Sequence, residues 1–386
     1  MQKIKFYLFP SIFLLIIFGF MLGTLFNVFR FSENKHTALF TLTEDTFQKN
    51  TVFKQEMITI NGAFQKLIGK HYIEDPNPDY AVVSLENGYL SWAYKAPDIA
   101  KQIESTIAFN EYLSDLSIPF CVVQMPFKIS KYDNQLPQGI SDHSNDTADL
   151  FVSSLKDKKI PVLDLRDSIQ EDNIDHYSLF FKTDHHWKPE TALWAAQKTG
   201  SFIDYHFDYN IDTTMYNIKN YNFKTYHNWF LGSQGKRIGP IYSGVDDISV
   251  ITPKFPTNFT FEIPHKSIVK NGSFAETMFD YTLIEKKDLY NLNPYAAYTG
   301  GDFPLNVIKN HNSKNTKKIL LLRDSFSCTY APFLSLAAKE LHIIDLRYYN
   351  NSLKSYIEAN DIDLVIMAYN PSAFLNSVQK FQLLNK

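Results

Sequence analysis

The sequence predicts a three-layer α/β fold with a parallel sheet, preceded by one transmembrane helix. Strand-like and helix-like segments alternate over residues 317–369, and such alternation builds parallel strands joined by helical crossovers. Another continuous apolar run, residues 118–128, is typical of a buried strand. A charge-free apolar run opens the chain at residues 6–26.

The run FYLFPSIFLLIIFGFMLGTLF would extend over about 30 Å as a helix, which is the thickness of the hydrocarbon core of a bilayer. Lys3 and Lys5 precede it and favour a cytoplasmic N-terminus, although Arg30 and Lys35 beyond it weaken this bias. A cleaved signal peptide is the alternative, but the run is long and no small-x-small cleavage site follows it. We therefore expect a single-pass signal anchor over residues 1–30, with the rest of the chain outside the cytoplasm.

The next segment, residues 31–95, is expected to form a polar stalk, an amphipathic stretch and further N-terminal elements. Its last part, YAVVSLENGYLSW, alternates apolar and polar residues around Asn87-Gly88, which is a strong hairpin signal. Residues 99–115 have apolar side chains at helical spacing and are expected to form a helix.

Two strands and a helix follow. IPFCVVQMPFK is apolar with a proline near each end, and IPVLDLRDSI is a second short strand. A helix is expected from Pro189 to Gly200, with proline in its first turn and glycine after its last. Residues 201–300 are rich in tyrosine, asparagine and phenylalanine, and we expect an insertion of short strands and loops there.

The C-terminal part contains the clearest alternation. The expected elements are, in order, the strand KKILLL, the helix TYAPFLSLAAKEL, the strand HIIDLRYY, the helix SLKSYIEAND and the strand IDLVIMAY. Ligands of such folds bind beyond the carboxyl ends of the strands.

Composition excludes some classes of function. The chain has 386 residues and a formal net charge of −3, with no basic run, so we expect no nucleic-acid partner. Its two cysteines, Cys121 and Cys328, do not make a disulfide framework. Cys121 lies in an apolar run as a small hydrophobic residue, and we expect no bridge between the two.

LLLRDSFS places Ser325 at a turn between a strand and a helix. This is where α/β hydrolytic enzymes hold a nucleophile, because the N-terminus of the helix offers free N–H groups to a developing oxyanion. The alternative is that Asp324, Ser325 or Ser327 only caps the helix.

KTDHHWKPE supplies what a serine nucleophile needs, a base and an acid that orients it. Asp184 and His186 are two apart, so in an extended segment both side chains point to the same side, while His185 points away. A metal site and a purely structural loop are the competing interpretations. Adjacent histidines diverge in an extended chain and no HExxH or cysteine-rich ligand set accompanies them, so we expect neither a metal nor a cofactor.

These motifs resemble those of the bacterial DHHW protein family, which is related to the alginate O-acetyltransferases and to SGNH hydrolases. The segments that carry the resemblance extend over most of residues 75–375: VQMPFK, LDLRDSI, TDHHW, FLGS, YTGGDFPL, RDSFS and DLRYY. The resemblance implies an SGNH-like domain over residues 96–386, with the insertion at about 201–300.

The resemblance also implies site residues. The family's triad falls on Asp184, His186 and Ser325, with Trp187 packed beside the histidine. The remaining candidates for substrate binding or the oxyanion hole are Gly300, Gly301, Arg347 and Asn370. One departure concerns the nucleophile motif, Gly-Asp-Ser in SGNH esterases, where Arg323 replaces the glycine. A bulky residue there changes the freedom of the turn and puts simple esterase activity in doubt.

The expected function is that of a membrane-anchored O-acyltransferase that acetylates a cell-surface or exported polysaccharide through an acyl-serine intermediate. The resemblance implies a membrane-bound O-acyltransferase partner that supplies the acyl group. One alternative is a carbohydrate esterase with the same triad. The other is a non-catalytic glycan-binding or assembly protein that keeps the fold.

Overall fold

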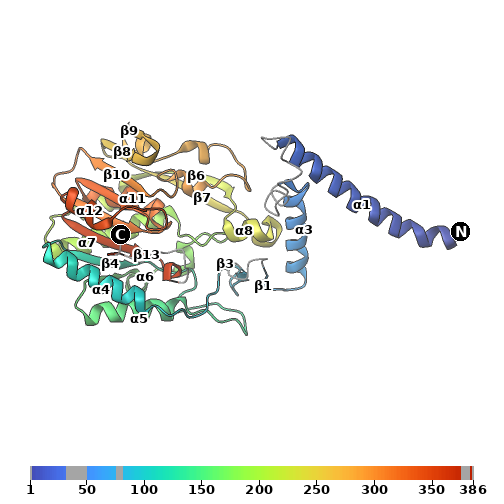
Figure 1. The fold of residues 1–386 in the computed structure, drawn as a ribbon, viewed down its shortest axis with the longest axis horizontal. Coiled ribbons are helices and arrows are strands. Elements are labelled where there is room, and N and C mark those ends of the chain that lie inside the picture. Colours follow the sequence, from blue (N-terminus) through green and yellow to red (C-terminus); the bar gives the residue numbers. More distant parts are fainter. Residues whose placement is uncertain (1, 32–49, 75–80, 375–382, 385–386) are drawn as a thin grey trace.

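The computed structural model describes residues 2–31, 50–74, 81–374 and 383–384. A long N-terminal helix, α1 (Gln2–Phe31), projects from a compact body (Figure 1). Its segment Pro10–Arg30 is long and apolar enough to cross a membrane, a test that a signal sequence also passes. The predicted polar stalk falls largely on residues 32–49, outside the described part of the chain.

An eight-stranded sheet forms the centre of the body, in the order β5-β4-β13-β11-β12-β10-β8-β9. Its first five strands are parallel, as the sequence predicts. Their bounds are β4 (Phe120–Gln124), β5 (Val162–Asp164), β11 (Lys318–Arg323), β12 (Glu340–Ile344) and β13 (Leu364–Tyr369). Apolar side chains fill both faces of these strands, which is why the runs are continuous rather than alternating.

The other side of the sheet is antiparallel, which the sequence did not predict. β10 (Leu305–Asn310) pairs antiparallel with β12, and β8 (Phe259–Ile263) and β9 (Ile268–Gly272) extend the sheet in the same manner. Two strands of the expected insertion therefore belong to the main sheet. β6 (Tyr221–Phe230) and β7 (Asp246–Pro253) form a separate two-stranded ribbon. The domain boundaries given above stay a prediction.

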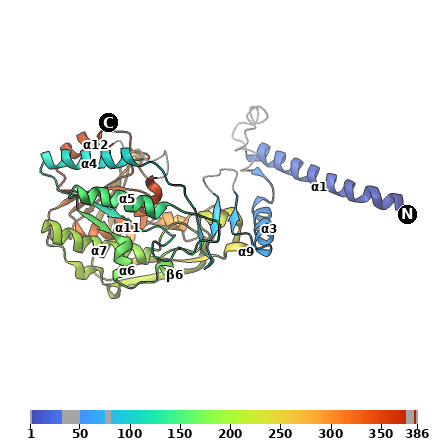
Figure 2. The same ribbon diagram turned by 90° about the horizontal axis from the view of Figure 1, so that it is seen from below.

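Helices cover both faces of the sheet, which gives the three layers (Figure 2). One face packs against α4 (Ala100–Asp115), α5 (Ser144–Asp157) and α12 (Leu353–Ala359). The opposite face packs against α7 (Pro189–Phe207) and α11 (Ser327–Leu334). The shorter helices are α6 (Leu165–Glu171), α8 (Ser233–Ile238), α9 (Pro240–Ser243) and α10 (Phe274–Thr277).

Two predicted helix ends differ from the structure. α7 continues past Gly200 because this glycine faces a packed neighbour: an added Cβ would lie 3.3 Å from the ring of Tyr216. The helix expected over residues 329–341 ends earlier, at Leu334, and a short 3₁₀ turn leads into β12. Gly200 therefore allows α7 to pack against its neighbours and does not mark the end of the helix.

The N-terminal elements lie between α1 and the body (Figures 1 and 2). They are α3 (Lys54–Leu67) and a three-stranded sheet of β1 (Tyr72–Ile73), β2 (Val82–Ser84) and β3 (Leu90–Ser91). The predicted hairpin at Asn87-Gly88 joins β2 to β3, and Gly88 has the positive φ (78°) that such a turn requires.

Candidate active site

The structure brings together the three residues expected to form a triad. The Nδ1 atom of His186 donates to Oδ1 of Asp184 over 2.5 Å. With the proton on Nδ1, the opposite nitrogen Nε2 accepts the hydroxyl hydrogen of Ser325 at 2.8 Å. The side chains of Asp184, His186 and Ser325 are thus connected in one line, in which His186 and Ser325 are 139 positions apart. This is the arrangement that a nucleophile, its base and an orienting acid require.

Ser325 lies two residues after the end of β11, at the carboxyl edge of the parallel strands. The turn is held by Asp324, whose carboxylate accepts the backbone N–H groups of Phe326 (3.0 Å) and Asn370 (2.7 Å). Burial raises the pKa of Asp324 to about 6, although these hydrogen bonds act in the opposite direction. The turn therefore joins the end of β11 to the end of β13.

Asp184 is held on both of its oxygens. Besides the ring of His186, Oδ1 accepts the backbone N–H of His186 at 3.0 Å, and Oδ2 accepts the N–H of Ser233 at 2.7 Å. Burial alone would raise the pKa of this carboxyl group. The neighbouring His185 and His186 and the hydrogen bonds outweigh burial, so the pKa lies well below its ordinary value. Asp184 is therefore ionised at neutral pH.

Gly232 is required for the close approach of α8 to Asp184. A Cβ added at Gly232 would lie 2.2 Å from the Cβ of Asp184 and 2.5 Å from its Cα. We expect Gly232→Ala to cost about 1–3 kcal/mol of stability by overpacking. The displaced carboxylate is expected to lower kcat/KM about 100-fold, the effect of a misplacement of about 1 Å.

Denaturant unfolding and steady-state kinetics on the full chain in detergent test this expectation. Gly19→Ala is the control, because a Cβ at Gly19 meets nothing within 4 Å and both quantities should stay unchanged. A Gly232→Ala chain with wild-type kinetics would show that the position of Asp184 does not depend on this contact.

The buried side chain of Lys128 also holds the segment that carries Asp184. Nζ of Lys128 donates to the carbonyl oxygens of Leu90 (2.6 Å), Lys182 (3.4 Å) and Asp184. It therefore joins the hairpin to the TDHHW segment. Burial lowers the pKa of Lys128 to about 7, although the negative charges of Asp184 and Asp246 act in the opposite direction.

Lys128 gives stability a pH dependence with a definite sign. In the unfolded chain lysine has a pKa of about 10.4, so between about pH 7 and pH 10 the unfolded state binds more protons than the native state. The contribution of Lys128 to the free energy of unfolding therefore rises with pH over this interval. We expect the free energy of unfolding of the wild type to rise relative to that of Lys128→Met over this interval, as measured by urea unfolding. Parallel pH profiles for the two proteins would contradict this assignment.

Aromatic side chains fix the orientation of the His186 ring. The ring of Tyr295 stacks on that of His186, with 4.1 Å between centroids and an interplanar angle of 17°. Its hydroxyl donates to the carbonyl of Phe326 over 2.9 Å. The indole N–H of Trp187 donates to the same carbonyl at 3.0 Å. Trp187 and Tyr295 thus connect the histidine segment to the turn that carries Ser325. No separate sequence pattern indicates Tyr295.

Arg347 lies in a buried charge cluster behind the nucleophile turn. Its guanidinium pairs with Asp345 (2.6 Å) and with Asp302 (3.0 Å). Arg323 is 1% exposed and pairs with the same two carboxylates. The residue in place of the esterase glycine therefore points into an ion-pair network, and its φ is not in the left-handed region. Substrate binding by Arg347 stays a prediction.

The other supporting candidates have contacts that shape the backbone. Gly300 and Gly301 have φ values of 75° and 106°, which glycine adopts without strain. They form the turn that leads to Asp302, and the carbonyl of Gly301 accepts from Arg323 at 3.5 Å. The side chain of Asn370 donates to Pro126 (2.7 Å) and accepts from Ser372 (3.0 Å). An oxyanion role for any of these three residues stays a prediction.

One group of side chains has the composition of a metal site. Asp184, His185 and His186 offer ligand atoms within 4.8 Å of one another. The expectation that His185 points away from the other two is therefore wrong, since its ring centroid lies 3.8 Å from that of His186. Each of these three residues is already hydrogen-bonded: both oxygens of Asp184 accept donors, and Nδ1 of His185 lies 2.9 Å from the hydroxyl of Ser233. A metal ion would have to replace these bonds, so the contacts fit an acid–base pair better than a ligand set.

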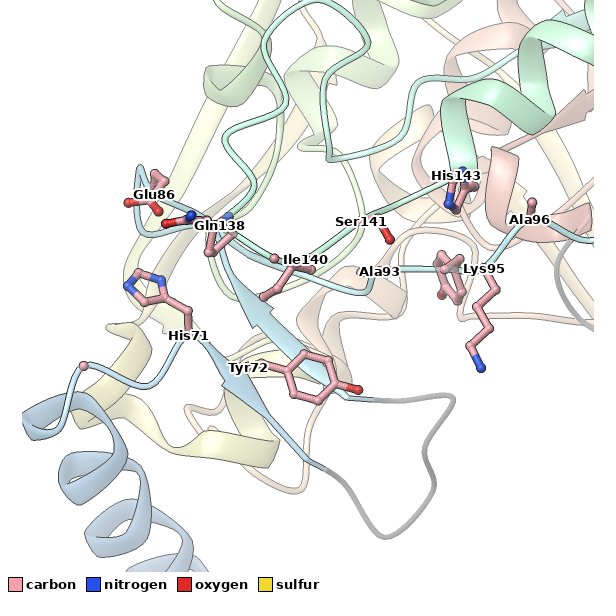
Figure 3. A pocket seen from close by; sticks show the side chains of 14 residues that line it. His71, Tyr72, Glu86, Ala93, Lys95, Ala96, Gln138, Ile140, Ser141 and His143 are labelled. Carbon is pink, nitrogen blue, oxygen red and sulfur yellow. The ribbon is translucent and has the colours of Figure 1, made fainter.

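A separate hollow lies beside the N-terminal sheet (Figure 3). It has a volume of about 870 Å³ and is bordered by β1 and by the loop from Pro137 to His143. Tyr72 and Tyr94 contribute aromatic rings to its wall. None of Asp184, His186 and Ser325 lines this hollow.

Comparisons with known proteins agree with this architecture. Residues 86–226 match the family model of the SGNH hydrolase-like domain of the acetyltransferase AlgX. The fold is similar to that of PatB1 from Bacillus cereus, with a TM-score of 0.63, 21% identity, and coverage of 78% of this chain and 99% of PatB1. It is also similar to a DHHW family protein from Eubacterium siraeum, with a TM-score of 0.58, 19% identity, and coverage of 82% and 98%.

A search of curated protein sequences found no match. At the identities given above, the structural likeness shows a shared fold. Residues 86–226 are therefore similar to the SGNH hydrolase-like domain of an acetyltransferase, as the motifs led us to expect, and the chain shares its fold with a DHHW family protein.

Proposed function

We propose that this protein is an extracytoplasmic, membrane-anchored O-acyltransferase that acetylates a cell-surface or exported polysaccharide. The observation that carries the proposal is the continuous hydrogen-bonded line from Asp184 through His186 to Ser325. The similarity to an acetyltransferase domain supports the choice of acyl chemistry. The apolar segment Pro10–Arg30 supports a membrane anchor.

In the first half-reaction, Oγ of Ser325 attacks the carbonyl carbon of the acyl donor and its proton passes to Nε2 of His186. The imidazolium ion then gives this proton to the leaving group as the bond to the donor breaks. An acyl-serine ester remains. Asp184 stays ionised and stabilises the positive ring of His186.

In the second half-reaction, His186 takes the proton of a sugar hydroxyl, whose oxygen attacks the acyl-serine. The ester bond to Ser325 breaks, the sugar carries the acyl group, and the proton returns to Ser325. A membrane-bound O-acyltransferase is the proposed source of the acyl group. Water in place of the sugar would make the same residues an esterase.

Intact-mass measurement on the full chain tests the proposal. The detergent-solubilised protein is incubated with an activated acetyl ester, and the modified peptide is mapped. We expect one acetyl group on Ser325, absent from Ser325→Ala. Ser327→Ala is the matched control. Ser327 is near the same turn and is buried, and its hydroxyl has no hydrogen-bond partner among the described residues.

The fate of the adduct then separates the two chemistries. Transfer of the acetyl group to an added polysaccharide supports the transferase, whereas release of acetate with the polysaccharide unmodified supports the esterase. A well-folded chain that forms no adduct, or that forms it equally in Ser325→Ala, would contradict both.

A further inference from the structure

Helix α3 presents its apolar side away from the protein. Six apolar residues recur at helical spacing on this side and are all exposed: Phe53, Met57, Ile60, Phe64, Leu67 and Ile68. Ile60 is 69% exposed and Leu67 is 83% exposed. We call these six side chains the outer face of α3. A helix on the surface of a soluble protein normally has the reverse arrangement, with its apolar side against the core.

The opposite side of α3, which includes Thr59, Gly62 and Lys66, is attached to the body. A Cβ at Gly62 would lie 1.6 Å from the carbonyl oxygen of Ile238. The hydroxyl of Thr59 lies 3.0 Å from that of Tyr290. Lys66 donates to the carbonyls of residues 241 (3.2 Å) and 242 (3.1 Å). These contacts fix the rotation of the helix, so the outer face cannot turn inward without breaking them.

The outer face is continuous with the apolar surface of α1. At the start of α3, the ring of Phe53 meets that of Phe20 edge-on, with 5.9 Å between centroids. The side chain of Val52 fits against Gly23, where an added Cβ would lie 3.3 Å from it. From Ile12 to Phe26 most large apolar side chains of α1 are exposed as well. The two exposed surfaces therefore meet at Phe20 and Phe53.

We propose that the outer face of α3 binds the lipid surface of the membrane next to α1, as a second membrane contact of this protein. An exposed apolar stripe of this extent marks an interaction site. Lipid is the occupant that fits, because the stripe continues a segment that is itself long and apolar enough to lie in lipid. Helices with one apolar side bury that side about 5–10 Å into the interface.

This contact also brings the candidate active site close to the bilayer. α8 connects the two: its last residue, Ile238, lies under Gly62 of α3, and its first, Ser233, donates its N–H to Asp184. A helix of six residues is about 9 Å long. An acyl group that arrives at the membrane surface would therefore have a short path to Ser325, a consequence that rests on the proposed function.

Fluorescence at single introduced cysteines tests the proposal without any measurement of activity. Ile60→Cys and Leu67→Cys are prepared in the full chain, labelled with an environment-sensitive dye and reconstituted into bilayers with and without quencher lipids. The two native cysteines are buried, so they give little background labelling. Glu104→Cys is the matched control, because Glu104 is an exposed position on α4, a helix that lies far from α3 in Figure 1.

We expect the dye at positions 60 and 67 to be quenched several-fold more by the quencher lipids than the dye at position 104. Equal exposure to water at all three positions would overturn the proposal. Protection from water without quenching by lipid would overturn it too, since the face would then be covered by protein, such as a second copy of the chain. Because no turnover is measured, a failure here is distinguishable from a failure of the proposed acyltransferase function.

Discussion

Ser325→Ala is expected to lower the rate of acetyl transfer by about 10⁴-fold or more, with the fold intact. Loss of a serine nucleophile removes the covalent route, and the residual rate comes from binding and electrostatic stabilisation alone. The hydrogen bond between the serine hydroxyl and Nε2 of His186 is the contact that is lost, which costs about 1 kcal/mol of stability. Single-turnover kinetics and denaturant unfolding give the two quantities.

Combined substitutions test whether Ser325 and His186 act as one unit. The single variants Ser325→Ala and His186→Ala are each expected to lose nearly as much rate as the double variant, because the effects of residues in one triad are not additive. Ser327→Ala should keep the wild-type rate within about twofold. Additive losses, or a Ser325→Ala chain that still transfers acetyl at a tenth of the wild-type rate, would argue for another nucleophile.

The parallel half of the sheet and the line of three residues follow from local sequence. Strands buried on both faces are continuous apolar runs, as in KKILLL, and each is followed by a helical segment. Asp184 and His186 were recognised because their spacing puts both side chains on one side of an extended segment. Ser325 is predicted because it lies in the short turn between a strand and a helix.

The groups that hold Asp184 and His186 in place cannot be predicted from local sequence, because their contacts join distant parts of the chain. The N–H of Ser233 reaches Asp184 across 49 positions, and Tyr295 stacks on His186 from a loop without periodic pattern. β10 has the sequence LNVIKN, in which polar residues follow no strict alternation, so it carries no strand signal that stands out. Lysine is rarely buried, so Lys128 in VQMPFK gave no sign that it would hold three carbonyl oxygens.

Arg323→Met is expected to destabilise the protein by about 3–5 kcal/mol, the cost of removing one partner from a buried ion pair. Asp345 is fully buried and would retain Arg347 as its pairing cation. Burial by itself would raise the pKa of Asp302, but the charges of Arg323 and Arg347 hold it well below its ordinary range. A depressed carboxylate pKa stabilises the folded state above about pH 4 and loses this contribution as pH falls further. The wild type should therefore lose stability on acidification more steeply than Arg323→Met.

A half-exposed ion pair provides the comparison that isolates burial. Lys309 and Glu262 pair at 2.7 Å with side chains 37% and 26% exposed, so Lys309→Met should cost less than about 1 kcal/mol. Adding Asp345→Asn to Arg323→Met should recover part of the loss, because it removes a carboxylate left in excess. If Arg323→Met were no more costly than Lys309→Met, the residue that replaces the esterase glycine would have no structural reason in this cluster. The presence of a side chain as large as that of Arg323 just before Ser325 would then require an explanation from the reaction.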